Sequence, residues 1–359
     1  MHFDLLNYHI YEDNLSLPAG ASFKSQLCSH EFCSRLHSSF LNSQKDFIQV
    51  YGNNSSEHWD RMIVGNKRSD ILNLMLAKKY NKALRYTLSN PIRHNLWYGF
   101  DNIARRFSAD VLNVDSYRIY DVLRRFYEAM GGHTHQEEKR RPTAYIDIDS
   151  LLRDIETALR ITLTFPAPYA KMMGLIDRRG IIRERALWGL YLAWRANQNR
   201  AKTILELGGG LGYAAFYSSI FGTASYTIVD LPLTLVASGH FLALTKGEEN
   251  INLYGTLGNE QDISSTSQKF NLLPPHAFPV GSKFDIVVNM DSFPEFGKDI
   301  AQEYVNKIKT VTQKFLSINH EGESYTVREL FINDPDLINY SRFPFWLRKG
   351  YVEEMFEFR

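Results

Sequence analysis

The sequence has few cysteines, no excess of charge of one sign and no long apolar run. Two cysteines in 359 residues, Cys28 and Cys33, do not form a disulfide framework and favour a reducing compartment. The 41 basic and 40 acidic residues leave a net charge of +1, which gives no overall basic field for nucleic acid. No run of 18 apolar residues occurs, and the first residues lack the pattern of a secretory signal. We therefore expect a cytoplasmic protein with neither a membrane nor a nucleic-acid partner.

The composition is that of an ordinary globular protein, with 44% hydrophobic and 23% charged residues. A chain of this length forms one large domain or two ordinary ones. The helical pattern of apolar residues dominates up to about residue 200, and alternating strands and helices follow it. We expect a mainly helical domain over 1–200 and an α/β domain over 201–359.

Helical periodicity and capping residues predict five helices in the first half. They cover residues 23–41, 70–84, 117–130, 151–163 and 181–197.

The alternation of short apolar runs and helical segments in the second half predicts a Rossmann-like α/β fold with a mostly parallel sheet and an antiparallel last strand. Short apolar runs predict strands over 203–207, 225–229, 251–254, 284–289 and 314–319. Alternation typical of an edge strand predicts the last strand over 351–358. The intervening helices are expected over 213–220, 231–243 and 299–311. Residues 261–283 carry a Leu-Leu-Pro-Pro sequence and are interpreted as an inserted loop over the sheet edge.

The most informative segment is the glycine-rich turn after the first of these strands. Gly208, Gly210 and Gly212 follow the acid Glu206, and Asp230 stands 24 positions after Glu206, at the end of the second strand. Glycine lets the backbone approach a ligand closely and adopt positive φ, so a strand, this turn and a helix form a nucleoside site. The G-x-G-x-G spacing differs from the G-x-G-x-x-G of dinucleotide folds. A dehydrogenase, or a turn that binds no ligand, is the alternative.

This arrangement resembles motif I of the class I S-adenosylmethionine (AdoMet) methyltransferases. The resemblance implies that Glu206 helps to hold the amino-acid end of AdoMet and that Asp230 accepts hydrogen bonds from the two ribose hydroxyls. It also implies cofactor contacts beyond the strand ends, from Leu231, Asn259, Asn289 and Met290. Asn259 stands where such enzymes hold the adenine amine.

A closer resemblance is to the sugar O-methyltransferases of bacterial polysaccharide and glycoside pathways. It depends on residues 205–210, 289–295 and 317–319, together with 97–99 and 183–184 in the first half, and covers most of 60–359. It implies transfer of a methyl group to a sugar hydroxyl and a helical N-terminal domain that binds substrate and forms a homodimer. A methyltransferase of polyketides or phenols, or a non-catalytic partner protein with an AdoMet fold, remains open.

An alcohol needs a positioned base before it attacks a methyl group. Ligands bind beyond the carboxyl ends of parallel strands, so the candidates are Asp291, Glu295 and His320. We expect His320 or Glu295 to act as base and Asp291 to orient a substrate hydroxyl. Asp291 could instead cap the next helix, and His320 could be an ordinary loop histidine. In plant-type O-methyltransferases a His–Asp pair follows this strand, whereas Pro294 and Glu295 stand here.

Neither Glu321 nor Glu323 belongs to a compact acid cluster, so we expect no metal.

The helical half contains candidate substrate contacts. Arg183 and Arg185 could meet a substrate phosphate or carboxylate, and Trp97 and Tyr98 could stack on a sugar ring. A salt-bridged helix face and an interdomain core are the respective alternatives.

Overall fold

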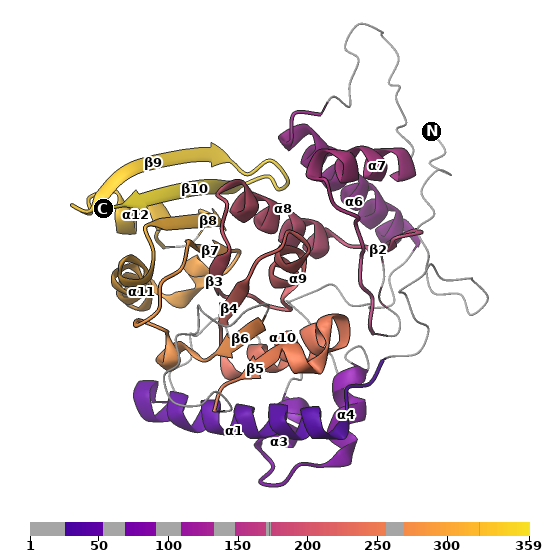
Figure 1. The fold of residues 1–359 in the computed structure, drawn as a ribbon, viewed down its shortest axis with the longest axis vertical. Coiled ribbons are helices and arrows are strands. Elements are labelled where there is room, and N and C mark those ends of the chain that lie inside the picture. The colour runs from indigo at the N-terminus through magenta and orange to yellow at the C-terminus, as the bar shows by residue number, and fades with distance from the viewer. Residues whose placement is uncertain are drawn as a thin grey trace, which may run out of the picture.

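A computed structural model describes residues 26–52, 69–90, 109–132, 148–169, 172, 174–255, 269–322 and 324–359. The first half contributes the helices α1 (His30–Tyr51), α3 (Ser69–Leu76), α4 (Lys82–Ser89), α6 (Ala109–Ala129), α7 (Ile148–Leu159) and α8 (Glu184–Gln198). A small antiparallel hairpin of β1 (Leu175–Asp177) and β2 (Gly180–Ile182) precedes α8. Figure 1 shows α6 and α7 on one side of the molecule and α1, α3 and α4 together on another.

The second half is built on an eight-stranded sheet with the order β5-β6-β4-β3-β7-β8-β10-β9. Its strands are β3 (Thr203–Leu207), β4 (Ser225–Val229), β5 (Ile251–Leu253), β6 (Lys269–Leu273), β7 (Ile286–Met290), β8 (Lys314–His320), β9 (Leu337–Pro344) and β10 (Tyr351–Phe358). All neighbouring pairs are parallel except those of β10, which is antiparallel to β8 and to β9. The predicted fold class, a mostly parallel sheet with an antiparallel last strand, is confirmed.

Both faces of the sheet are covered by helices, as a parallel sheet requires. The helices α8, α9 (Tyr213–Ile220) and α10 (Pro232–Lys246) share one apolar cluster with Ile204 and Ile228. A second apolar cluster, on the opposite face of the sheet, contains residues of the helices α11 (Lys298–Val311) and α12 (Val327–Phe331) together with Leu205 and Val287. Alternate residues of each strand therefore enter opposite cores.

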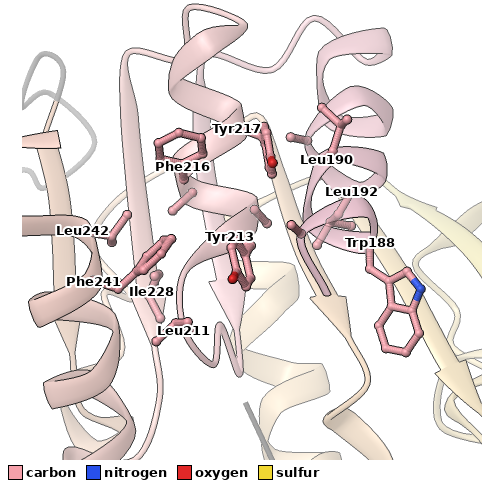
Figure 2. Packing of buried hydrophobic residues seen from close by; sticks show 14 of the residues in the cluster. Trp188, Leu190, Leu192, Leu211, Tyr213, Phe216, Tyr217, Ile228, Phe241 and Leu242 are labelled. Atoms are coloured by element: carbon pink, nitrogen blue, oxygen red, sulfur yellow. The ribbon is translucent and has the colours of Figure 1, made fainter. Parts of the chain in front are cut away.

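The N-terminal helices continue the first of these cores. Helix α8 packs against α9 (Figure 2), and a Cβ atom added to Gly189 would lie 2.6 Å from the Cβ of Tyr213. Helix α1 packs against α10, β5 and the short 3-10 helix η3 (Pro275–Ala277). As a result, segments of the first half reach the edge of the sheet where the strands end.

The strands at 203–207 and 225–229 and the helix at 213–220 are confirmed residue for residue. The interpretation of 261–283 as a loop is wrong, because β6 lies within it and separates β5 from β4. The buried Asn271 interrupts the apolar run of β6, so the sequence does not show a strand there. The Asn271 amide donates to Ser225 and Thr227 on β4, and the Asn271 side-chain oxygen accepts from Asn252 on β5. The predicted third strand, 251–254, is therefore the sheet edge.

Other elements also differ from the prediction. The first helix, expected over 23–41, is α1 and covers His30–Tyr51, because Ser29 caps it. Residues 70–84 contain two helices, because Asn81 caps a new one at Lys82. The helix expected from 181 begins at Glu184, since Gly180–Ile182 pairs with β1. The last strand lies inside the sheet rather than at its edge, which β9 forms. The first residues of β9 carry mixed, largely exposed side chains, so its sequence lacks a clear alternation.

Candidate active site

The strand order reverses between β3 and β7, which is where open α/β sheets bind ligands. A cavity of about 210 Å³ lies at this point. The glycine turn, the ends of β4 and β7, and the residues just after β7 form its walls. Phe47 and Tyr51 at the end of α1, and Arg185 and Trp188 of α8, also line it. The cavity is thus closed by both halves of the chain.

The glycine turn is shaped by contacts that a side chain would disrupt. Gly208, Gly210 and Gly212 all have positive φ, of 73°, 54° and 92°. A Cβ atom on Gly208 would lie 2.1 Å from Ser292 Oγ, and one on Gly209 would lie 2.7 Å from an Ile228 side-chain carbon. Ser238 Oγ donates to the carbonyl of Gly210 at 2.7 Å and holds the turn from α10.

Asp230 lies directly beside this turn. Its carboxylate accepts hydrogen bonds from the backbone amides of Gly210 at 3.1 Å and Leu231 at 2.7 Å. Burial raises the pKa of Asp230 to about 7, although these two amides act in the opposite direction. Asp230 therefore presents a fixed acceptor at the end of β4.

Glu206, at the end of β3, is the second acid of this wall and is only 4% exposed. The Tyr226 hydroxyl donates to it at 2.9 Å. Burial raises the pKa of Glu206 to about 8, and the charge of Asp230 adds to this effect. Two carboxyl groups that are costly to ionise thus stand together at the glycine turn, where a cationic ligand would lower both pKa values.

Beyond β7 the backbone at Asp291 adopts φ of +58°. The Asp291 carboxylate accepts from Arg185 at 2.5 Å, from Arg348 at 3.3 Å and from the Tyr351 hydroxyl. Burial alone would raise the pKa of Asp291, but Arg185, Tyr351 and Arg348 together lower it below its ordinary value. The side chain is therefore an ion-pair partner and does not cap the helix that follows.

Most of the predicted site residues line this one cavity. They are Glu206, Gly208, Gly210, Asp230, Leu231, Met290, Asp291 and Glu295. Glu295 lies in the 3-10 helix η4 (Phe293–Phe296).

Four predicted residues lie elsewhere in the described structure. Gly212 is the N-terminal cap of α9 and is outside the cavity lining. Arg183 is buried at the N-terminal cap of α8, two residues before Arg185, which does line the cavity. His320 also lies outside the lining, and its ring meets Tyr351 edge to face at 5.5 Å.

Asn289, the fourth, is fully buried beneath the cavity. Its amide donates to the Leu207 carbonyl at 2.7 Å and to Ser292 Oγ at 2.6 Å, and its oxygen accepts from Asn319 at 2.7 Å. It therefore ties β3, β7 and β8 together. Trp97, Tyr98 and Asn259 lie outside the described residues.

Sequence reasoning missed the residues that join the site from distant segments. Phe47 and Tyr51 come from α1, Tyr304 from α11, and Arg348 from the turn between β9 and β10. No predicted element covers Phe47 or Tyr51, because the helix expected over 23–41 ends before them and α1 continues to Tyr51. Within the described part of the chain, no group of three or more His, Cys, Asp or Glu side chains is arranged to hold a metal ion. No described helix is both long enough and apolar enough to cross a bilayer.

No known family profile matches the chain. No curated protein matches it either. Among solved structures it is similar to an O-methyltransferase from Bacillus cereus in complex with SAH, at 9% identity over 57% of this chain and 88% of that one, with a TM-score of 0.34. It is also similar to the O-methyltransferase TomG from Streptomyces achromogenes in complex with SAM, at 13% identity over 48% and 80%, with a TM-score of 0.34. A third is magnesium protoporphyrin IX methyltransferase from Synechocystis PCC 6803 with bound SAM, at 9% identity over 71% and 100%, with a TM-score of 0.33.

Proposed function

We propose that this protein is an AdoMet-dependent methyltransferase that methylates a hydroxyl group of a small molecule. The observation that carries the proposal is the pair of buried acids, Glu206 and Asp230, beside a glycine turn at the switch point of the sheet. Their raised pKa values mark an acidic end of the cavity, where no cationic side chain of the described residues stabilises either anion. AdoMet carries an ammonium and a sulfonium group, whereas the pyrophosphate of a dinucleotide would meet two acids.

The residues of the cavity fit AdoMet in their chemistry. Asp230, held by the amides of Gly210 and Leu231, is an acceptor for a ribose diol. Glu206 offers a carboxylate to the ammonium group, and Gly208, Gly209 and Gly210 have no side chains that would exclude the nucleoside. When bound, AdoMet supplies an electrophilic methyl group on sulfur.

Glu295 is the residue that we assign as general base. It lines the cavity just beyond β7, whereas His320 lies outside the lining. Asp291 is a weak base, because Arg185 and Arg348 stabilise its anion. Glu295 would take the proton of the acceptor hydroxyl as oxygen attacks the methyl group, and such a base contributes about 10²–10⁴-fold in rate.

The acceptor is proposed to be a sugar or glycoside, as the sequence resemblance implies. The helical half, 1–200, is proposed to be the substrate and dimerisation domain. Phe47, Tyr51, Arg185 and Trp188 of this half line the cavity, which supports a role in acceptor binding. A cytoplasmic homodimer remains the expectation.

Calorimetric titration with AdoMet, and with NAD as the competing cofactor, tests the proposal. We expect saturable binding of AdoMet and none of NAD. Asp230→Ala should weaken AdoMet binding at least about 100-fold, because two hydrogen bonds to a charged acceptor are lost.

Asp285→Ala is the matched control. This aspartate accepts from the amides of Lys202 and Thr203 at the opposite edge of the same sheet, so its loss should leave AdoMet affinity unchanged. Binding of NAD instead of AdoMet, or unchanged AdoMet affinity in Asp230→Ala, would contradict the proposal.

A further inference from the structure

Two arginines from distant segments meet at the end of β7. Arg185 belongs to the first turn of α8, and Arg348 lies in the turn between β9 and β10. Their guanidinium carbons each lie 4.6 Å from the centre of the Trp188 ring, and that of Arg348 lies 4.0 Å from the Tyr351 ring. The buried Trp188 indole lies apart from the aromatic rings of α9 (Figure 2). Stacking on these rings holds the two planar groups in place before any ligand arrives.

Both arginines share a single carboxylate, that of Asp291. Each guanidinium has five N–H donors, and Asp291 accepts one hydrogen bond from each. Among the described residues, no other acid pairs with Arg185 or Arg348. The cluster therefore keeps a charge of about +1 and several free donors.

Other arginines of this protein are paired very differently. Arg179 binds three carboxylates, those of Asp149, Glu156 and Asp177. Arg342 binds two, those of Glu321 and Glu354. Arg179 and Arg342 are thus each neutralised by two or more acids, whereas Arg185 and Arg348 share one acid between them.

The two arginines are also accessible. The Arg185 side chain is 32% exposed and that of Arg348 is 35% exposed. Arg185 lines the cavity that Glu206 and Asp230 line on the other side. Asp230 and Asp291 follow strands two positions apart in the sheet, a separation of about 10 Å at the usual strand spacing. The cavity thus has an acidic end and a basic end.

We infer that Arg185 and Arg348 bind an anionic group, a carboxylate or a phosphate, on the methyl acceptor. The inference rests on the proposed function and narrows its acceptor to an acidic or phosphorylated sugar. A fork of guanidinium N–H groups matches the paired oxygens of either anion. Asp291 is a positioning residue: its carboxylate orients both arginines, and its positive φ brings it into reach of them.

The test compares three sugars that share one ring. Glucose, glucuronate and glucose 6-phosphate are titrated into the protein saturated with S-adenosylhomocysteine, and ligand-observed NMR gives the dissociation constants. We expect at least one anion to bind about 10-fold more tightly than glucose, and the better of the two identifies the source of the charge. Arg348→Gln should remove this preference for the anionic sugars.

Lys349→Gln is the matched control, because it removes a positive charge from the same turn at an exposed position. It should keep the preference. Arg348→Lys retains the positive charge but lacks the paired guanidinium N–H groups. It should therefore keep only part of the preference that Arg348→Gln loses. Melting temperature and S-adenosylhomocysteine affinity verify that each variant is folded.

Equal affinities for all three sugars, or a loss of the preference in Lys349→Gln as large as in Arg348→Gln, would overturn the inference. A protein that binds no S-adenosylhomocysteine would instead overturn the proposed function. That outcome is recognised before any sugar is added.

Discussion

Replacing Glu206 by Gln should stabilise the ligand-free protein near neutral pH and weaken AdoMet binding. The Glu206 carboxyl is buried, and its only described hydrogen bond is donated by Tyr226. Burial raises its pKa from 4.5 to about 8. Gln has the same shape, accepts the same hydrogen bond and carries no charge, so it resembles the protonated acid.

The magnitude follows from linkage between folding and protonation. Between pH 4.5 and pH 8 the folded protein holds a proton on Glu206 that the unfolded chain has released. The free energy of unfolding therefore falls as pH rises through this range, by about 1.4 kcal/mol per unit from this group. From pH 4.5 to pH 7 the loss amounts to about 3 kcal/mol, which Glu206→Gln should abolish.

Equilibrium urea denaturation of the ligand-free protein at pH 5, 6, 7 and 8 measures this effect. Glu353→Gln is a control of opposite sign, because Glu353 is equally buried, at 4% exposure, but is paired with Arg195 at 2.6 Å. Its replacement should lower the free energy of unfolding at pH 7 by about 1–3 kcal/mol. A Glu206→Gln protein that is less stable than the wild type at pH 7 would refute the reasoning, since it would show that the Glu206 anion is already compensated.

Three further predictions concern the same region. Gly208→Ala should destabilise the protein by at least about 2 kcal/mol and abolish AdoMet binding, because its Cβ would meet Ser292 Oγ at positive φ; an unchanged melting temperature would contradict this. Asn289→Ala should cost about 2–4 kcal/mol in urea denaturation, because it removes the buried hydrogen bonds of Asn289 with the Leu207 carbonyl, Ser292 Oγ and the Asn319 amide, and a loss below 1 kcal/mol would count against the network. Glu295→Gln should lower kcat about 100-fold or more with little change in AdoMet affinity, and a larger loss in His320→Ala would move the base to His320.

The turn and the two acids could be predicted from the sequence because all three depend on local chemistry. Positive φ favours glycine at 208, 210 and 212, and an acid that ends a parallel strand lies at the ligand edge of the sheet. Asp291, Glu295 and Met290 follow the same rule. They reach the cavity because they leave β7 at its carboxyl end.

The rest of the site depends on long-range packing that no local pattern encodes. Arg348 meets Asp291 only because β10 returns antiparallel beside β8 and carries its turn to the ligand edge. Tyr51 lines the cavity because α1, remote in sequence, packs on α10. Asn289 is predicted to contact the cofactor, and its apolar neighbours in β7 give no sign that its amide links three strands.

The order of the sheet edge was harder to predict for the same reason. Strand β6 contains a polar residue that is buried only because Ser225 and Thr227 on β4 satisfy it. The sequence pattern therefore predicts a loop for its five residues. Because β6 lies between β5 and β4, the predicted third strand lies one position farther out in the sheet than the sequence pattern indicates.

A crystal structure with S-adenosylhomocysteine tests the central claim most directly. The account predicts both ribose hydroxyls within hydrogen-bonding distance of Asp230, the amino-acid end beside Glu206, and the sulfur facing the residues that follow β7. A nucleoside bound away from Asp230, or a crystal soaked at saturating concentration with no ligand at the glycine turn, would contradict it.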